Sequence, residues 1–389
     1  MRVLVVGGGI TGSVAATALA QRGAEVDLVE IVPEWKGTGH GITLQGNALR
    51  SFRDIGVWER VRAIGFAFDR VRLSRADGTP IVELATPRTG GPDLPATMGA
   101  LRSALQEVLS EAVYAAGVTV RLGLTVNDWT CDPSGVQVTF TDGTAGRYDL
   151  VVGADGIKSQ LRRQLGIGTK PLPTGMSIWR VLAERDQDMD CSELFYEGPR
   201  YKAGYSPISA THCYAYLLGS DTFLPGGLLP GGSLPDGSLP DASLPDGRPP
   251  GAVLRERSLG YGGRWARIRA QLTNETPVNY QRVESLLVPG PWYRDRVIVI
   301  GDAVHACPPL IAQGAAMCTE DAIVLAELVT SGQPVPEALE EFMKRRIGRV
   351  RMVVENSLTL AEWEINPDTP GADPARIMAE TLSALEVPA

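Results

Sequence analysis

Three stretches of the sequence place glycines or an acid directly behind an apolar run, where the end of a buried strand can hold a ligand. In the first, Gly7, Gly9 and Gly12 form a G-x-G-x-x-G turn, and Glu30 follows about 20 residues later. Gly7 permits the tight turn, Gly9 lets the backbone approach a pyrophosphate, and Gly12 lets helix and strand pack closely. Glu30 can accept hydrogen bonds from ribose hydroxyls. This spacing predicts a dinucleotide site without separating NAD from FAD.

The other two stretches lie much later in the chain. Asp155 follows the apolar run "DLVVGA", and Asp302 follows "VIVIG" in the same way. Behind Asp302, a helix is expected to open at three small residues, Gly314, Ala315 and Ala316. The free N–H groups and partial positive charge of such a helix end can stabilise an anionic ligand that comes close to the backbone. A single dinucleotide turn does not explain these later junctions.

With the three stretches in this order, the chain resembles the single-component FAD-dependent aromatic hydroxylases, the p-hydroxybenzoate hydroxylase-like family of flavoprotein monooxygenases. The resemblance extends to about Val329. It implies that the glycine turn holds the ADP half of FAD and that Asp302 accepts hydrogen bonds from the ribityl hydroxyls. It also implies that the helix opening at Gly314 faces the flavin pyrimidine, and that Asp155 serves FAD and, transiently, the nicotinamide cofactor.

The resemblance carries over to several further cofactor-binding positions. Arg102 matches an arginine that reaches the FAD phosphate and ribityl region, and Val126 is counted among the positions beside the cofactor. The stretch "GHGITLQGNALRSF" resembles the segment next to the isoalloxazine ring, where Gly41 allows close approach and His40 is a neighbour. Gly46 stands where many relatives have proline, so a looser local turn is expected there.

The activity implied by this resemblance is hydroxylation of a small aromatic substrate. FAD would be bound noncovalently, NADH or NADPH would reduce it as a transient co-substrate, and O₂ would react to form a flavin C4a-hydroperoxide. Two alternatives remain open at this point. One is a flavin oxidoreductase of the same fold that does not oxygenate, and the other is a non-catalytic flavin-binding or ligand-binding protein.

The residues of the substrate site are harder to predict, because no side chain is marked as a catalytic base. Arg180 could hold a carboxylate or pair with an acid across a sheet, and Tyr214 and His40 could assist a phenolic substrate. Glu320 and Asp321 are expected to form pairs or caps and not to catalyse. Further candidates for lining the pocket are Trp179, Tyr205 and His212.

The elements that must position these residues predict an α/β fold, with a Rossmann-like FAD-binding domain, an inserted β-sheet substrate domain and C-terminal helices. Asp77 and Gly78 predict a hairpin turn. Five tandem LPDGS-type pentapeptides predict a flexible surface loop. The expected ranges are 1–70, 98–175 and 284–335 for the FAD-binding domain, 71–97 and 176–283 for the substrate sheet, 224–248 for the repeat loop, and 336–389 for the helical segment.

Composition and sequence patterns also bear on partners, metals and location. A formal charge of -8 argues against a nucleic-acid partner. The five cysteines show no C-x-x-C spacing, and three histidines without an H-E-x-x-H pattern predict no bound metal. No run reaches the roughly 18 apolar residues of a membrane span. Met1 leads straight into the first apolar run, so no signal peptide is expected. The expected protein is cytoplasmic, a monomer or homodimer.

Overall fold

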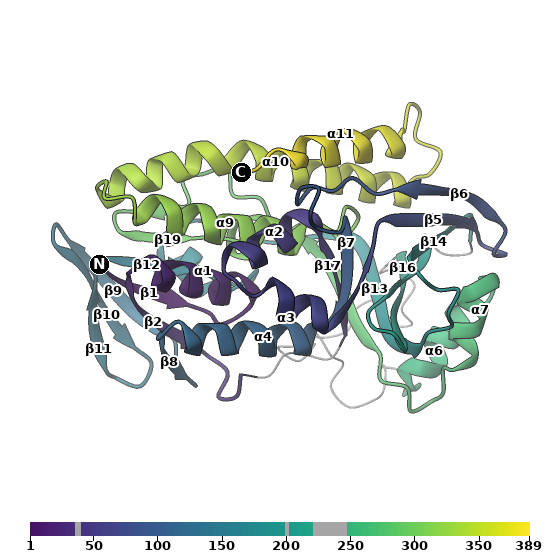
Figure 1. The fold of residues 1–389 in the computed structure, drawn as a ribbon, viewed down its shortest axis with the longest axis horizontal. Helices are drawn as coiled ribbons and strands as arrows, with labels where there is room; N and C mark the ends of the chain where they lie inside the picture. The colour runs from purple at the N-terminus through teal and green to yellow at the C-terminus, as the bar shows by residue number, and fades with distance from the viewer. Residues whose placement is uncertain (36–39, 199–201, 221–246) are drawn as a thin grey trace.

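Two large β-sheets lie side by side along the long axis of the molecule, with helices between and above them (Figure 1). The computed structural model describes residues 1–35, 40–198, 202–220 and 247–389. The predicted repeat loop therefore lies, up to residue 246, outside the described residues.

The first sheet has six strands in the order β18-β19-β12-β1-β2-β8. All neighbours are parallel except β18 and β19. Its central strands are almost completely buried because the sheet is covered by protein on both faces. The strands are β1 (Arg2–Val6), β2 (Glu25–Glu30), β8 (Thr119–Leu122), β12 (Leu150–Gly153), β18 (Tyr293–Arg294) and β19 (Val297–Val299).

Helices and a small antiparallel sheet pack around this first sheet and share its hydrophobic core. The small sheet consists of β9 (Val126–Asp132), β10 (Gly135–Phe140) and β11 (Ala145–Tyr148). The helices are α1 (Ile10–Gln21), α2 (Gly46–Asp54), α3 (Trp58–Ala63), α4 (Arg102–Ala115), α5 (Gln160–Gln164), α8 (Asp302–His305) and α9 (Gly314–Val329). Helix α1, which follows the glycine turn, packs against α4 and α9.

The second sheet has seven strands in the order β17-β13-β16-β15-β14-β5-β6. One of its faces packs against α6 (Pro250–Arg257) and α7 (Gly263–Ala270) around a separate hydrophobic core. Strands β5 and β6 form the hairpin predicted around Asp77 and Gly78. The strands are β5 (Arg70–Arg75), β6 (Pro80–Ala85), β13 (Leu172–Glu184), β14 (Ser192–Tyr196), β15 (Lys202–Pro207), β16 (His212–Ser220) and β17 (Asn279–Ser285).

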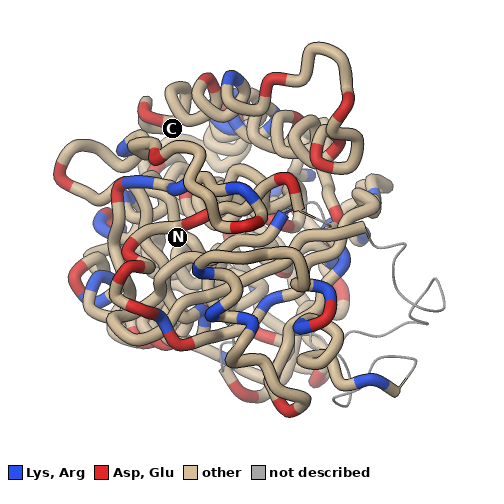
Figure 2. The backbone as a smooth tube through the Cα atoms, turned by 90° about the vertical axis from the view of Figure 1, so that its right-hand side faces the viewer, with Lys and Arg blue, Asp and Glu red and all other residues tan. Residues whose placement is uncertain are grey.

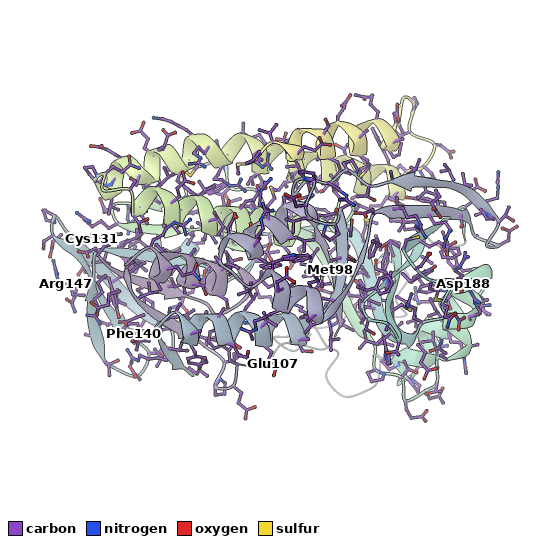
Figure 3. The ribbon with its side chains drawn as sticks, viewed as in Figure 1. Met98, Glu107, Cys131, Phe140, Arg147 and Asp188 are labelled. Carbon is purple, nitrogen blue, oxygen red and sulfur yellow. The ribbon has the colours of Figure 1, made fainter. Side chains whose placement is uncertain are left out.

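A third, three-stranded sheet joins the two halves, formed by β3 (Gly41–Gln45), β7 (Thr97–Leu101) and β4 (Gly65–Phe68). Met98 of β7 lies near the middle of the molecule in Figure 3, whereas Arg147 and Asp188 mark its opposite ends. Strand β3 contacts α9 on one side and β16 on the other. Residues of this small sheet are therefore placed to meet both large sheets.

Two C-terminal helices run along the top of the molecule in Figure 1, α10 (Val335–Ile365) and α11 (Pro374–Glu386). Helix α10 contacts both α9 and β13, so it connects the two halves. A helix of 31 residues spans about 46 Å, which is long enough for this role. The arrangement confirms the predicted α/β fold with a second sheet and C-terminal helices.

The described helices include no membrane-spanning segment, and the face shown in Figure 2 has no strongly basic region. Within the described ranges, no helix combines the length and apolar character needed to cross a bilayer. Lys and Arg residues are interspersed with Asp and Glu over the face shown in Figure 2. The described residues also contain no cluster of three His, Cys, Asp or Glu side chains that could hold a metal ion.

Candidate active site

The three glycines of the first motif occupy positions where a side chain would collide with backbone or fill open space. Gly7 has a φ of +102°, and a Cβ there would lie 2.4 Å from the carbonyl oxygen of Ala154. A Cβ on Gly12 would lie 1.8 Å from the Gly7 carbonyl oxygen, so α1 and β1 pack as closely as predicted. A Cβ on Gly9 would meet nothing within 4 Å. The backbone at Gly9 is therefore open to a ligand.

The glycine turn is held by side chains from distant parts of the chain. The carbonyl oxygen of Gly8 accepts hydrogen bonds from Trp35 Nε1 at 2.7 Å, Gln106 Nε2 at 2.9 Å and Ser13 Oγ at 3.0 Å. The Gly8 N–H donates to Glu30 Oε2 at 2.6 Å. Glu30 thus stands at the turn, as predicted. Trp35 and Gln106 were not predicted, because no sequence pattern connects them with Gly8.

The second junction is capped by its own acid. Oδ2 of Asp155 accepts hydrogen bonds from the backbone N–H groups of Gln160 at 2.8 Å and Leu161 at 3.1 Å, at the start of α5. Its Oδ1 is buried and has no partner among the described residues, and burial raises the pKa of the carboxyl. Val126 is buried at the start of β9, and its carbonyl oxygen accepts from Gln160 Nε2 at 3.3 Å. Val126 and Asp155 therefore lie close together.

The third junction leaves its acid exposed. Asp302 begins α8, and among the described residues its carboxylate accepts one hydrogen bond, from Cys318 Sγ at 3.6 Å. Gly301 before it has a φ of +66°, and a Cβ there would lie 2.8 Å from Thr11 Oγ1. Gly301 therefore lies directly against Thr11, so the third junction packs on the start of α1. Asp302 thus has most of its hydrogen-bonding capacity available for a ligand.

Helix α9 opens behind this loop with the three predicted small residues. A Cβ on Gly314 would come no nearer than 3.8 Å to another atom, the sulfur of Cys307. Ala315 is half-buried and Ala316 is buried. The first backbone N–H groups of this 16-residue helix are therefore approachable, and its dipole places partial positive charge there.

The next turn of α9 contributes Glu320 and Asp321 to a buried ion cluster. The other members of this cluster are His305 of α8 and Arg346 and Arg349 of α10. Arg346 is fully buried and contacts Asp321 Oδ1 at 2.7 Å and Glu320 Oε2 at 2.8 Å. His305 Nε2 lies 2.6 Å from Asp321 Oδ2. Burial alone would raise the pKa values of both carboxyls, but the neighbouring cationic groups lower them overall. The prediction that Glu320 and Asp321 form pairs is confirmed.

The segment between His40 and Asn47 differs from expectation at one position. The turn at Gly46 is not loosened by the lack of proline, because the Gly46 N–H donates to the Ala96 carbonyl oxygen at 2.8 Å. Proline has no N–H with which to make this bond. A Cβ on Gly46 would also lie 2.6 Å from the backbone nitrogen of Gly90. Asn47 then donates through Nδ2 to Glu320 Oε1 at 3.0 Å, which connects this segment with the buried ion cluster.

Arg102 and Asp302 face the same space, although they are 200 positions apart in the sequence. Arg102 is exposed, yet desolvation by the surrounding protein lowers the pKa of its guanidinium, while the charge of Asp302 acts in the opposite direction. We use the name cleft for the space beside the accessible Arg102 side chain, which Asp302 and Arg180 are close enough to influence. The Arg180 guanidinium is near enough to lower the pKa of Arg102 further. The cleft therefore brings together residues predicted from three distant segments.

Arg180 is fixed in this cleft by uncharged oxygen atoms. Its Nε donates to the Tyr214 hydroxyl at 3.1 Å, and its Nη1 donates to Asn279 Oδ1 at 3.2 Å and Gln281 Oε1 at 2.8 Å. Across the described ranges, no carboxylate forms an ion pair with Arg180. Of the two roles predicted for Arg180, pairing with an acid across the sheet is not observed among these residues.

His40 and Gly41 bring the small joining sheet against this group. His40 is buried, and its ring centroid lies 6.3 Å from that of Tyr214. A Cβ on Gly41 would lie 2.2 Å from the Cβ of Tyr214, so only glycine allows this contact. The backbone N–H of Arg102 donates to the His40 carbonyl oxygen at 2.9 Å. The three predicted catalytic candidates, His40, Arg180 and Tyr214, are thus neighbours.

The remaining candidates do not lie in the cleft. Trp179 alternates with Arg180 along β13 and points into the core on the other face, with its ring centroid 4.8 Å from that of Tyr280. Tyr205 is buried on that same face and donates to Glu193 Oε2 at 2.8 Å. His212 is exposed at the start of β16. Strand alternation instead places Tyr216 beside Tyr214, a residue that the Tyr-x-Tyr spacing could have revealed.

Comparison with known proteins agrees with this geometry. The sequence matches the protein family described as FAD binding domain over residues 1–197 and 283–357. The chain belongs to this family. The matched segments include the glycine turn, Arg102 and Asp155, the strand of Arg180, and the loop and helix that follow Asp302.

Relatives of this FAD-binding chain match nearly its full length. The 2-heptyl-3-hydroxy-4(1H)-quinolone synthase of Mycobacteroides abscessus is 30% identical over 87% of this chain and 84% of its own length. The FAD-dependent urate hydroxylase of Klebsiella pneumoniae is 28% identical over 91% and 88%. The crystal structure of K. pneumoniae HpxO with FAD and uric acid superimposes with a TM-score of 0.78 at 25% identity, over 99% of this chain and 92% of that one.

The predicted enzyme class is therefore confirmed. The chain is an FAD-dependent monooxygenase of the aromatic hydroxylase class, and FAD is its cofactor. An oxidoreductase that does not oxygenate and a non-catalytic binding protein are set aside. The family membership also explains why the cleft joins a dinucleotide turn with a second, distant junction at Asp302.

Proposed function

We propose that this monooxygenase hydroxylates a small, planar aromatic or heteroaromatic compound with an acidic oxygen, and that Arg180 and Tyr214 bind that oxygen. The observation that carries the proposal is the Arg180 guanidinium, which has no carboxylate partner in the described part of the chain and is held by three neutral oxygen atoms. A guanidinium without a counterion is suited to bind an anionic ligand, because a bound carboxylate, phenolate or enolate would supply the missing negative charge.

The residues around the cleft fit FAD. The open backbone at Gly9 and the start of α1 would bind the pyrophosphate, and Glu30 would bind the adenosine ribose. Arg102 and Asp302 would hold the ribityl-phosphate portion, and the first N–H groups of α9, at Gly314, would face the flavin. Val126, Asp155 and Gly41 would line its course, together with Ala315 and Ala316. Bound FAD supplies the oxygen-activating chemistry once NADH or NADPH has reduced it.

The chain's own side chains would orient the substrate. Arg180 would neutralise the charge of the acidic oxygen. The Tyr214 hydroxyl already accepts a hydrogen bond from Arg180, and it would donate a hydrogen bond to the same substrate oxygen. The His40 ring would pack against the Tyr214 ring and hold it in position. An apolar cluster that includes Ile178 and Leu310 would exclude water from the reacting atoms.

The relatives support this substrate class. Urate and 2-heptyl-3-hydroxy-4(1H)-quinolone, the compounds that appear in their names, contain planar rings with ring-bound oxygen. Neither is assigned to this chain. A relative named 3-amino-4-hydroxybenzoate 2-monooxygenase, from Streptomyces cremeus, extends the range to single benzoate rings.

Substitution of Arg180 tests the proposal. A panel with uric acid, 3-amino-4-hydroxybenzoate and 2-heptyl-4(1H)-quinolone would be titrated into the FAD-loaded enzyme while flavin absorbance and NAD(P)H consumption are followed. Arg180→Met should weaken binding of responsive compounds about ten- to a hundredfold, since a hydrogen bond to a charged group contributes about 1.5–3 kcal/mol. FAD affinity should stay unchanged.

The matched control is Arg351→Met, which removes the same charge from an exposed position on α10. It should bind every compound as the parent enzyme does. Equal binding by Arg180→Met and the parent would contradict the role of Arg180. A parent enzyme that responds to no planar compound would contradict the substrate class itself.

A further inference from the structure

Tyr216 occupies the centre of the sheet face that borders the cleft. Pairing across β13, β16 and β15 places Arg180, Tyr216 and Gly204 in one row, and Tyr214 lies two residues along β16 on the same face. The ring centroids of Tyr214 and Tyr216 are 5.5 Å apart. Tyr216 is therefore a direct neighbour of the proposed substrate-binding pair.

Gly204 provides the space on which the Tyr216 ring lies. A Cβ added to Gly204 would lie 2.5 Å from the Tyr216 hydroxyl oxygen, 2.6 Å from Cζ and 2.9 Å from Cε2. The outer half of the ring thus covers the Gly204 backbone. Any side chain at this position would displace the ring from the Gly204 backbone.

Tyr216 combines partial accessibility with close packing. Tyr216 is only partly buried, yet desolvation by the surrounding protein raises the pKa of its hydroxyl well above the ordinary value. Tyr216 also packs on the apolar cluster that Leu310 joins, and Leu310 belongs to the loop between Asp302 and Gly314. Tyr216 is therefore a neighbour of Tyr214 and packs on the same apolar cluster as the proposed flavin-binding loop.

We propose that Tyr216 is a specificity-determining residue, whose partly accessible ring stacks on the planar ring of the substrate while Gly204 sets the depth of the pocket. This inference rests on the proposed function, because it requires a planar aromatic substrate. Offset stacking between aromatic rings contributes roughly two- to tenfold in affinity beyond the area that it buries. Arg180 and Tyr214 bind the polar edge of the substrate, and Tyr216 binds its face.

Substitution of Gly204 tests the inference in the FAD-loaded enzyme, with uric acid and 3-amino-4-hydroxybenzoate as probes and flavin absorbance as the readout. In Gly204→Ala, the new methyl group meets the end of a flexible side chain, so the Tyr216 ring is displaced from the Gly204 backbone. The dissociation constant of a bound probe should rise about tenfold. Tyr216→Leu removes the ring and should raise it roughly two- to tenfold. In the Tyr216→Leu background, Gly204→Ala should add less than about twofold, because the colliding ring is gone.

Gly146 provides a matched control in the other half of the molecule. A Cβ there would lie 2.8 Å from Cε2 and the hydroxyl oxygen of Tyr148, so Gly146→Ala creates a similar collision on β11. This variant should lose thermal stability and bind the probes normally.

Three results would overturn the inference. Gly204→Ala could weaken probe binding equally with and without the Tyr216 ring, or both single variants could bind like the parent enzyme. If the parent enzyme binds no planar compound, the proposed substrate class fails first and the inference fails with it. Probe binding that depends on Arg180 but not on Tyr216 would support the proposed function and contradict the role of Tyr216.

Discussion

The buried ion cluster and the cleft face around Arg180 are two concentrations of charge that differ in how the charge is balanced. In the cluster, Arg346 is fully buried and contacts two carboxylates within 2.8 Å. In the cleft, Arg180 is partly exposed, and its hydrogen-bond partners among the described residues are neutral oxygens. Charge that is balanced inside the protein serves the fold, whereas charge left unbalanced beside an accessible space is available for a ligand.

The two regions are connected through α9. Its first turn is the proposed flavin-facing end, and its second turn carries Glu320 and Asp321. Asp321 also accepts from the Gly301 N–H at 3.0 Å, directly before Asp302. The cluster thus holds in place the loop and helix that the cleft presents to the cofactor. Substitutions in the two regions should therefore have different first effects, on stability in one and on binding in the other.

The largest effect is expected from Arg346→Met. It leaves two buried carboxylates without their central partner, which typically costs about 3–5 kcal/mol of the free energy of unfolding. Urea denaturation followed by tryptophan fluorescence measures the loss. Arg345→Met is the control, because this neighbour pairs with the more exposed Glu327 at 2.9 Å and should cost no more than about 1 kcal/mol. Equal losses in both variants would contradict the assignment of the cluster to stability.

The sequence could predict the local geometry around the proposed FAD-binding residues because its signals there are local. Gly7, Gly9 and Gly12 are fixed by a turn of six residues, and the packing around Gly7 and Gly12 follows directly from the absence of Cβ atoms. Asp302 and Gly314 lie within one short loop and helix start. In each case the residue type and its spacing already describe the geometry.

The substrate half depends on contacts that the sequence does not express. Arg180 and Trp179 are adjacent in the chain but point to opposite faces of β13, and the choice between the faces is made by what packs there. The sequence predicted that Asp321 forms pairs or caps, but only the tertiary structure identifies His305 and Arg346 as its partners. Strand register and side-chain packing therefore determine which of the candidate residues face the cleft.

A second, smaller effect compares these two aspartates. Asp302→Asn should weaken FAD binding about ten- to a hundredfold, because charge-assisted hydrogen bonds contribute about 1.5–3 kcal/mol, and should hardly change the stability of the apoprotein. Asp321→Asn should do the reverse, lowering the melting temperature first. Equilibrium dialysis of FAD and thermal unfolding of the apoprotein give the two values. Retention of full FAD affinity in Asp302→Asn would remove Asp302 from the proposed cofactor site.

The smallest effect is expected from Tyr214→Phe. The Tyr214 hydroxyl accepts from Arg180, and within the described part of the chain no acceptor is found for its own proton. Loss of a neutral hydrogen bond costs about 0.5–1.5 kcal/mol, so the dissociation constants of panel compounds should rise about two- to tenfold. FAD affinity and stability should remain unchanged, because no fully buried partner is left unsatisfied.

Tyr205→Phe is the matched control for this last prediction, since it removes the same hydroxyl from the opposite face of the same sheet. The Tyr205 hydroxyl donates to buried Glu193 at 2.8 Å, so its loss leaves a carboxylate less satisfied and should lower stability while compound binding stays normal. The two tyrosines lie on neighbouring strands and differ mainly in the face to which they point. If Tyr205→Phe weakened compound binding as much as Tyr214→Phe, the assignment of one face to the fold and the other to the substrate would be wrong.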